Sequence, residues 1–132
     1  MVPKPPSIAL LGLASGYASV YAMLIPIARA HGYALAVHGT MNRDLDLIAV
    51  PWTEQATDAL PLILAIKEAT KTCTHSFTDD HYWPDCAPTI KPFGRRAYSL
   101  HFTERGGDGP YIDISVLPKQ PVNAPAQGDL LP

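Results

Sequence analysis

The sequence has no long hydrophobic run, few cysteines and no large excess of charge of one sign. No stretch approaches the roughly 18 to 20 consecutive apolar residues that a membrane span needs. Two cysteines among 132 residues do not make a disulfide framework. Ten basic and 12 acidic side chains give a formal net charge of −2. That balance provides no strong electrostatic footprint for duplex DNA, although it does not exclude a local basic patch. These absences argue against a membrane protein and favour the cytoplasm.

The residues that are present fit one packed domain. Hydrophobic residues make up 47% of the chain and charged residues 17%, which is too apolar for a disordered protein. A chain of this length buries roughly two-thirds of its unfolded surface, enough for one core. The 14 prolines cluster at both ends and around a central loop. We therefore expect a loose N-terminal segment at 1–14, a single α+β domain at 15–117 and a Pro-rich tail at 118–132.

The pattern at the start of this domain predicts a helix followed by a β-hairpin. Apolar side chains recur every three or four residues over 15–31, and Pro26 predicts a kink or a helix in two pieces. Gly32 then suits a helix C-cap. Two apolar runs at 33–38 and 44–50 are joined by a short polar connection, which favours an antiparallel hairpin.

The second half of the domain predicts another helix and two more strands. Thr53 is a candidate cap for a helix that extends to about residue 72, with a second candidate start at Asp58 because of Pro61. Residues 73–94 lack periodicity and are expected to form a long loop. The fold class is then α+β: a mostly antiparallel sheet of about four strands, with two helices covering one face. The two later strands are expected at 95–103 and 111–117.

Three aspartates are predicted to share the face of the sheet that the helices leave open. Side chains alternate along a strand, so Asp44 and Asp46 point to the side opposite Leu45. Asp113 lies between apolar residues of the last strand, so its side chain points away from the core in the same way. If the two strands are neighbours, three carboxylates converge. Hard oxygen ligands of this kind suit Mg²⁺ or Mn²⁺, and two such ions can clamp the oxygens of a phosphoryl-transfer reaction.

The stretch HGTMNRDLDLI at 38–48 resembles the signature of the nucleotidyltransferase superfamily, which shares the fold of DNA polymerase β. The resemblance implies a turn at Gly39 and Thr40 that holds a nucleoside triphosphate. It also implies catalytic, Mg²⁺-binding acids at Asp44, Asp46 and Asp113. Two departures stand out. Thr replaces the usual Ser of the turn, and only three residues separate it from the acids, which leaves no room for a phosphate-binding helix.

Two arginines complete the candidate nucleotide site. Arg43 precedes the acids directly, and Arg95 opens the third predicted strand on the side expected to face them, where it could reach a phosphate or Asp113. The alternative is that Arg43, Arg95 or Arg96 simply pairs with the aspartates on a solvated face, where such ion pairs stabilise little.

Histidines and cysteines offer further candidate ligands. Cys73, His75, His81 and Cys86 form the inventory of a tetrahedral zinc site, but their spacing matches no familiar pattern. The alternatives are two free cysteines or a disulfide between them under oxidation. His38 ends a strand beside the acids and could act as a general base or a ligand, although a hydrogen-bonded structural histidine is more common. His101 is likewise a candidate general base or ligand, with a hydrogen-bonded structural role as the more common alternative.

Two functions therefore stay open at the level of sequence. The segments VHGTMNRDLDLIAVPW and KPFGRRAYSL also resemble short uncharacterised proteins of tailed phages and prophages, which places the chain in the cytoplasm of a host cell. One hypothesis is a minimal, trimmed nucleotidyltransferase that binds nucleotide and Mg²⁺ through the aspartates. The alternative is a catalytically inactive phage accessory protein that binds a host protein. The two differ in whether the three carboxylates converge within reach of one cation.

Overall fold

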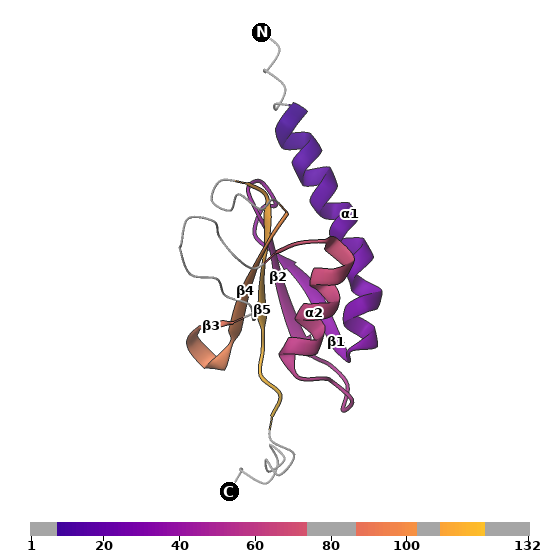
Figure 1. Cartoon of the computed structure of the whole chain (residues 1–132), viewed down its shortest axis with the longest axis vertical. Helices are drawn as coiled ribbons and strands as arrows, with labels where there is room; N and C mark the ends of the chain where they lie inside the picture. The colour runs from indigo at the N-terminus through magenta and orange to yellow at the C-terminus, as the bar shows by residue number, and fades with distance from the viewer. Residues whose placement is uncertain (1–7, 74–86, 103–108, 121–132) are drawn as a thin grey trace, which may run out of the picture.

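The computed structural model describes residues 8–73, 87–102 and 109–120. In these ranges both helices lie on the same side of one sheet (Figure 1). The elements, in chain order, are α1 (Ile8–Ala30), β1 (Tyr33–His38), β2 (Leu45–Pro51), α2 (Ala59–Thr70), β3 (Thr89–Ile90), a short 3-10 turn (Pro92–Gly94), β4 (Arg96–His101) and β5 (Tyr111–Val116). Neither helix, over the residues described, is long and apolar enough to cross a membrane.

The sheet has five strands in the order β1-β2-β5-β4-β3. The pairs β1–β2, β4–β5 and β3–β4 are antiparallel, whereas β2 and β5 run parallel. The predicted α+β class and the mostly antiparallel sheet are therefore confirmed, together with the hairpin of β1 and β2. The prediction of about four strands missed β3, because a strand of two residues is too short to leave an alternating pattern.

The helix α1 starts earlier than its predicted boundary. It begins at Ile8 and continues past Pro26 without being divided, so part of the predicted loose segment 1–14 is helical. Residues 8–14 are mostly good helix formers without a polar stripe, which is why a search for amphipathic spacing did not include them. The predicted cap at Gly32 is confirmed by its φ of +82°, in the left-handed region.

The helix α2 begins at Ala59, so the first predicted start, at Thr53, is wrong and the second, at Asp58, is correct. The segment 53–58 instead closes the corner between α1 and β1. The Thr57 N–H donates to the His31 carbonyl at 2.9 Å, and the Tyr33 hydroxyl donates to the Thr57 carbonyl at 2.6 Å. A Cβ at Gly32 would lie 2.5 Å from the Ala56 Cα, so this corner requires glycine.

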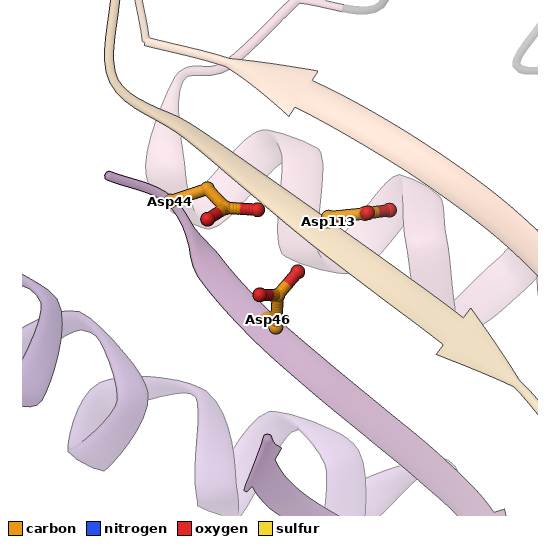
Figure 2. Close-up of side chains that lie close together, drawn as sticks. All are labelled: Asp44, Asp46 and Asp113. Atoms are coloured by element: carbon orange, nitrogen blue, oxygen red, sulfur yellow. The ribbon is translucent and has the colours of Figure 1, made fainter. Parts of the chain in front are cut away.

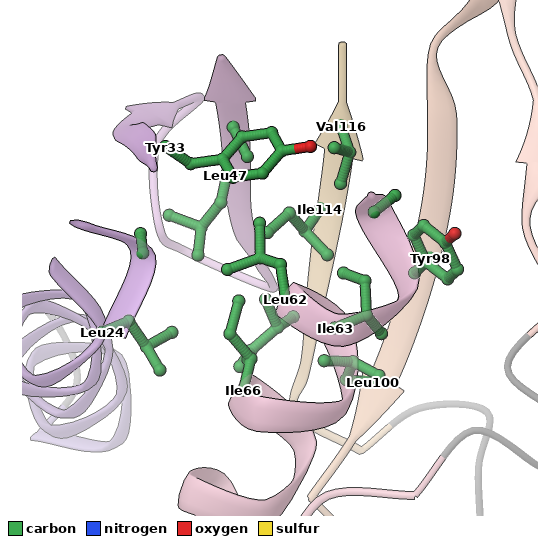
Figure 3. Packing of buried hydrophobic residues seen from close by; sticks show 14 of the residues in the cluster. Leu24, Tyr33, Leu47, Leu62, Ile63, Ile66, Tyr98, Leu100, Ile114 and Val116 are labelled. Atoms are coloured by element: carbon green, nitrogen blue, oxygen red, sulfur yellow. The ribbon is translucent and has the colours of Figure 1, made fainter. Parts of the chain in front are cut away.

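The hydrophobic core fills the space between the two helices and the sheet (Figure 3). Alternate residues of each central strand point into it, and those in between point to the uncovered face of the sheet, here called the open face. The most completely buried large side chains come from α1, α2 and three strands: Leu24, Leu45, Leu47, Leu62, Ile63, Ile66, Leu100, Ile112, Ile114 and Val116. This burial fixes which residues of β2 and β5 remain for the open face.

Candidate metal centre

The parallel pairing of β2 with β5 brings the acids of two distant segments together. Asp46 is the register partner of Asp113, and Asp44 lies just before β2 begins. The flanking Leu45 and Ile112 are completely buried on the helix side. A one-residue slip of either strand would bury an aspartate in the core, so core packing holds the acids on the open face.

The three carboxylates converge as the sequence predicts. One oxygen from each of Asp44, Asp46 and Asp113 can be chosen so that all lie within 4.8 Å of one another, and each residue is partly exposed (Figure 2). We call this group the acid cluster. The ion pairs that the structure shows within the described ranges, Lys71–Glu68 and Lys119–Asp58, lie elsewhere. No arginine or lysine of these ranges pairs with the cluster, so the predicted alternative of surface ion pairs is not what holds it.

Burial and the crowding of like charges disfavour ionisation of Asp46 and Asp113. Burial, contact with Asp44 and the charges of Asp44 and Asp113 raise the pKa of Asp46 to about 6, although the nearby His38 opposes the shift. Burial and the charge of Asp44 also raise the pKa of Asp113, against the opposing charge of Lys91. A cation placed between the carboxylates would relieve this repulsion.

The loop that leads into the cluster depends on a glycine. Gly39 follows β1 with a φ of +91°, and a Cβ there would lie 3.0 Å from the Asp46 Oδ2. Residues 39–44 contain no helix, in agreement with the short spacer in the sequence. Met41 also has a positive φ, of 59°, and packs against the core, which anchors the loop. Gly39 therefore lets the backbone pass close to a metal-ligand candidate.

Two tyrosines of α1 make hydrogen bonds to the backbone of β1 and of the loop before the cluster. The buried Tyr17 donates its hydroxyl hydrogen bond to the Arg43 carbonyl at 2.8 Å, directly before Asp44. Tyr21 donates to the Leu35 carbonyl of β1 at 3.0 Å. Both residues belong to the helical apolar spacing of 15–31, which predicts that they pack but not that they make these polar contacts.

Aromatic and histidine side chains surround the cluster. His38 is the register partner of Asp46 and is exposed, so its predicted place beside the acids is confirmed. Tyr111 was not singled out by sequence. Its pKa is raised by burial and by the charges of Asp44 and Asp113, and its ring lies 5.3 Å from that of His101. Burial lowers the pKa of His101, which favours a neutral ring.

The candidate nucleotide-binding residues are spread more widely than the acids. The Thr40 Oγ1 accepts a long hydrogen bond from the Asn42 N–H at 3.4 Å, and the Arg43 side chain is exposed. Within the described ranges, no hydrogen bond or ion pair joins the Thr40 or Arg43 side chain to the acid cluster. Arg95 lies before β4, and its guanidinium donates to the Pro92 carbonyl at 3.2 Å and to the Ser115 Oγ at 3.4 Å. Ser115 shares the open face with Asp113, so Arg95 faces the expected side.

The candidate zinc ligands fall largely outside the described residues. Only Cys73 is described. Its backbone bridges that of His101, with both N–H···O distances at 2.8 Å. His75, His81 and Cys86 belong to the segment 74–86, outside the described ranges, so the zinc and disulfide alternatives stay predictions.

The chemistry of the acid cluster fits a hard divalent cation. Three carboxylate oxygens within 4.8 Å of one another could hold a hard cation, which would complete its coordination shell with water or with other oxygen ligands. The chain matches no protein-family model, and no curated protein is detectably similar to it in sequence. The geometry therefore establishes a three-aspartate cluster on an α+β sheet that could hold a metal ion.

Proposed function

We propose that this chain is a minimal nucleotidyltransferase-like protein, of phage or prophage origin, that binds Mg²⁺ and a nucleotide at the acid cluster. The observation that carries the proposal is the convergence of Asp44, Asp46 and Asp113 without a lysine or arginine partner in the described ranges. The strand register holds three carboxylates close together, where they repel one another. A divalent cation bound between them would offset that repulsion.

The arrangement of the site supports the same reading. The resemblance implies a glycine turn, two acids on one strand and a third acid on another strand. Here Gly39 packs against Asp46, and Asp113 is the register partner of Asp46. The placement of Asp46 and Asp113 follows from core packing on the opposite face.

The chemistry divides between the acids and their surroundings. A bound cation would neutralise charge on phosphate oxygens and align the attacking and leaving groups of a phosphoryl transfer. Asp44, Asp46 and Asp113 would hold the cation, and Arg95 would offer its guanidinium to a phosphate on the same face. Nucleotide binding is expected to be weak, because the loop 39–44 has no helix whose N-terminus could hold phosphates.

Calorimetric titration and thermal unfolding with Mg²⁺ and Mn²⁺, each with and without nucleoside triphosphates, test the proposal. We expect either cation to raise the melting temperature of the wild type, since it binds only the folded state. Asp46→Asn and Asp113→Asn should abolish that rise. Asp58→Asn is the matched control, because Asp58 is an exposed aspartate paired with Lys119 away from the cluster. Cation binding that survives both cluster substitutions would overturn the proposal.

The second candidate is a catalytically inactive accessory protein that binds a host protein. Exposed aromatic side chains favour it, since Trp52 is 76% exposed and Phe93 is 94% exposed. This function needs no cation at the acid cluster. A wild type that binds neither cation nor nucleotide, yet forms a stoichiometric complex with a purified host protein through these aromatics, would establish it in place of the enzyme.

A further inference from the structure

The tight connection between β3 and β4 forms a second distinctive surface, here called the basic tip and defined as residues 90–96. Ile90 is the register partner of Arg96, and the Lys91 N–H donates to the Arg95 carbonyl at 2.8 Å. The 3-10 turn at Pro92–Gly94 closes the connection. The basic tip is thus a built turn with defined backbone contacts.

The basic tip displays apolar side chains that the fold does not use. Phe93 is 94% exposed and Ile90 is 66% exposed. Phe93 also has a φ of +66°, in the left-handed region that bulky residues rarely adopt. An aromatic ring that occupies a disfavoured conformation and buries almost nothing contributes little to folding. Such outliers concentrate at binding sites, so a ligand is the better explanation for Phe93.

The basic tip also concentrates positive charge in a chain that is acidic as a whole. Three of the ten basic residues fall within the six positions 91–96, which contain no acid, while the net charge of the chain is −2. The Arg95 guanidinium is oriented by hydrogen bonds to the Pro92 carbonyl at 3.2 Å and, over a longer distance, to the Ser115 Oγ at 3.4 Å. A guanidinium held in this way loses little freedom when it binds a phosphate.

One of these cations, Arg95, shares the open face with the acid cluster. Arg95 reaches Ser115, which alternates with Asp113 on that face of β5. Arg96 lies on the other side, because its register partner Val116 points into the core. An anionic ligand on Arg95 would therefore lie on the same face of the sheet as the acid cluster.

We propose that the basic tip binds single-stranded nucleic acid, with a base stacked on Phe93 and phosphates on Lys91 and Arg95. Exposed aromatic rings beside cations are the elements that bind single strands without sequence preference. Binding itself does not depend on the proposed function. Only the further step, in which the strand is the substrate of phosphoryl transfer at the acid cluster, rests on it.

The surroundings of the basic tip favour a flexible strand over the other polyanions. An anionic membrane would have to approach the whole open face, including the three aspartates, which repel it. Two cations at one turn are too few for the extended footprint of duplex DNA, and paired bases cannot stack on Phe93. A single strand can contact the turn locally and present its unpaired bases.

Fluorescence anisotropy with a labelled 12-nucleotide oligothymidylate tests this proposal. The titrations use the full chain at low salt with EDTA, so that no metal contributes. We expect Phe93→Ala to weaken binding about tenfold, the effect of losing one stacked base. The double variant Lys91→Ala/Arg95→Ala should weaken binding further. It should also reduce the slope of log K against log salt by about 1.4, or about 0.7 for each phosphate contact.

Matched controls distinguish binding at the basic tip from non-specific binding to other exposed side chains and from binding at the acid cluster. Trp52→Ala removes another exposed aromatic, and Arg29→Ala another exposed cation, so both should bind like the wild type. Asp46→Asn should retain oligonucleotide binding, so a failed metal site leaves this proposal standing. Wild-type affinity in Phe93→Ala would overturn it. So would equal affinity for the matching duplex, or Phe93-dependent binding to phosphatidylserine vesicles in place of the oligonucleotide.

Discussion

The two faces of the sheet are built from the same strands, yet they are subject to different constraints. On the helix side, Leu47 and Ile114 are almost fully buried and their size is fixed by the core. On the open face, Asp46 and Asp113 are only partly buried, and burial together with the charges of neighbouring carboxylates makes their ionisation unfavourable in the folded state. The comparison teaches that one face maintains the strand register and the other uses that register to position charge.

The strongest test of this difference between the two faces is to truncate two adjacent side chains of β2, one on each face. Leu47→Ala removes a buried side chain that is 2% exposed and should lower the free energy of unfolding by about 2–5 kcal/mol. Ile48→Ala alters the open face, where Ile48 is half-buried, and should lower it by about 1 kcal/mol. Urea denaturation measures both values. If both substitutions lower the free energy of unfolding equally, the open face must also be covered by another part of the protein.

A smaller effect is expected at the glycine that supports the acid cluster. Gly39→Ala places a Cβ 3.0 Å from the Asp46 Oδ2 at a φ of +91°, and should lower the free energy of unfolding by about 1–3 kcal/mol. Gly16→Ala is the matched control. Gly16 lies in α1 with no atom within 4 Å of an added Cβ, so this change should stabilise by about 0.5–1 kcal/mol. A neutral Gly39→Ala variant would mean that the loop moves freely away from Asp46.

The repulsion within the acid cluster predicts a pH-dependent gain from a neutral side chain. The pKa of Asp46 is raised from 3.8 to about 6, so the folded state binds its proton more tightly than the unfolded chain does. Ionisation of Asp46 therefore lowers stability, fully above pH 6, and this loss disappears as the pH falls below 3.8. Asp46→Asn should raise the free energy of unfolding at pH 8 by about 1–2 kcal/mol, after allowance for solvent screening.

Denaturant unfolding in EDTA at pH 8 and pH 4 measures this difference, which should be several times smaller at pH 4. If Asp46→Asn instead costs several kcal/mol at both pH values, Asp46 is a structural group with hydrogen bonds that the asparagine cannot replace. The metal proposal would then be dropped in favour of the inactive accessory protein.

The smallest effect concerns the hydroxyl that holds the loop. Tyr17→Phe removes the hydrogen bond to the Arg43 carbonyl and should lower the free energy of unfolding by about 0.5–1.5 kcal/mol. Because Arg43 precedes Asp44, the same change should weaken Mg²⁺ binding measured by calorimetry. Tyr21→Phe, which loses a similar bond to Leu35 away from the cluster, should leave Mg²⁺ affinity unchanged. Equal weakening in both variants would point to a general loosening of α1.

The sequence predicts the acid cluster well because alternation is a local property of a strand. Once Leu45 is buried, Asp44 and Asp46 must face the other way, and the same holds for Asp113 beside Ile112. The pairing of β2 with β5 is not local, however. It was a hypothesis in the sequence, and only the sheet order confirms it.

The parts of the site that escape prediction depend on contacts without periodicity. The approach of Gly39 to Asp46 requires the three-dimensional path of the loop. Helical spacing explains the burial of Tyr17 but does not reveal that its hydroxyl reaches Arg43. The exposure of Phe93 is equally hidden, since phenylalanine is among the residue types most often buried.

The parallel pairing of β2 with β5 has a consequence for how the molecule folds. Asp46 belongs to a local hairpin that can close early, whereas Asp113 arrives only when the last strand docks beside it. The acid cluster thus does not exist in any partly folded chain that lacks β5. A divalent ion that requires all three carboxylates would therefore slow unfolding without speeding the first steps of folding. Its binding would report, in real time, the moment at which the sheet is complete.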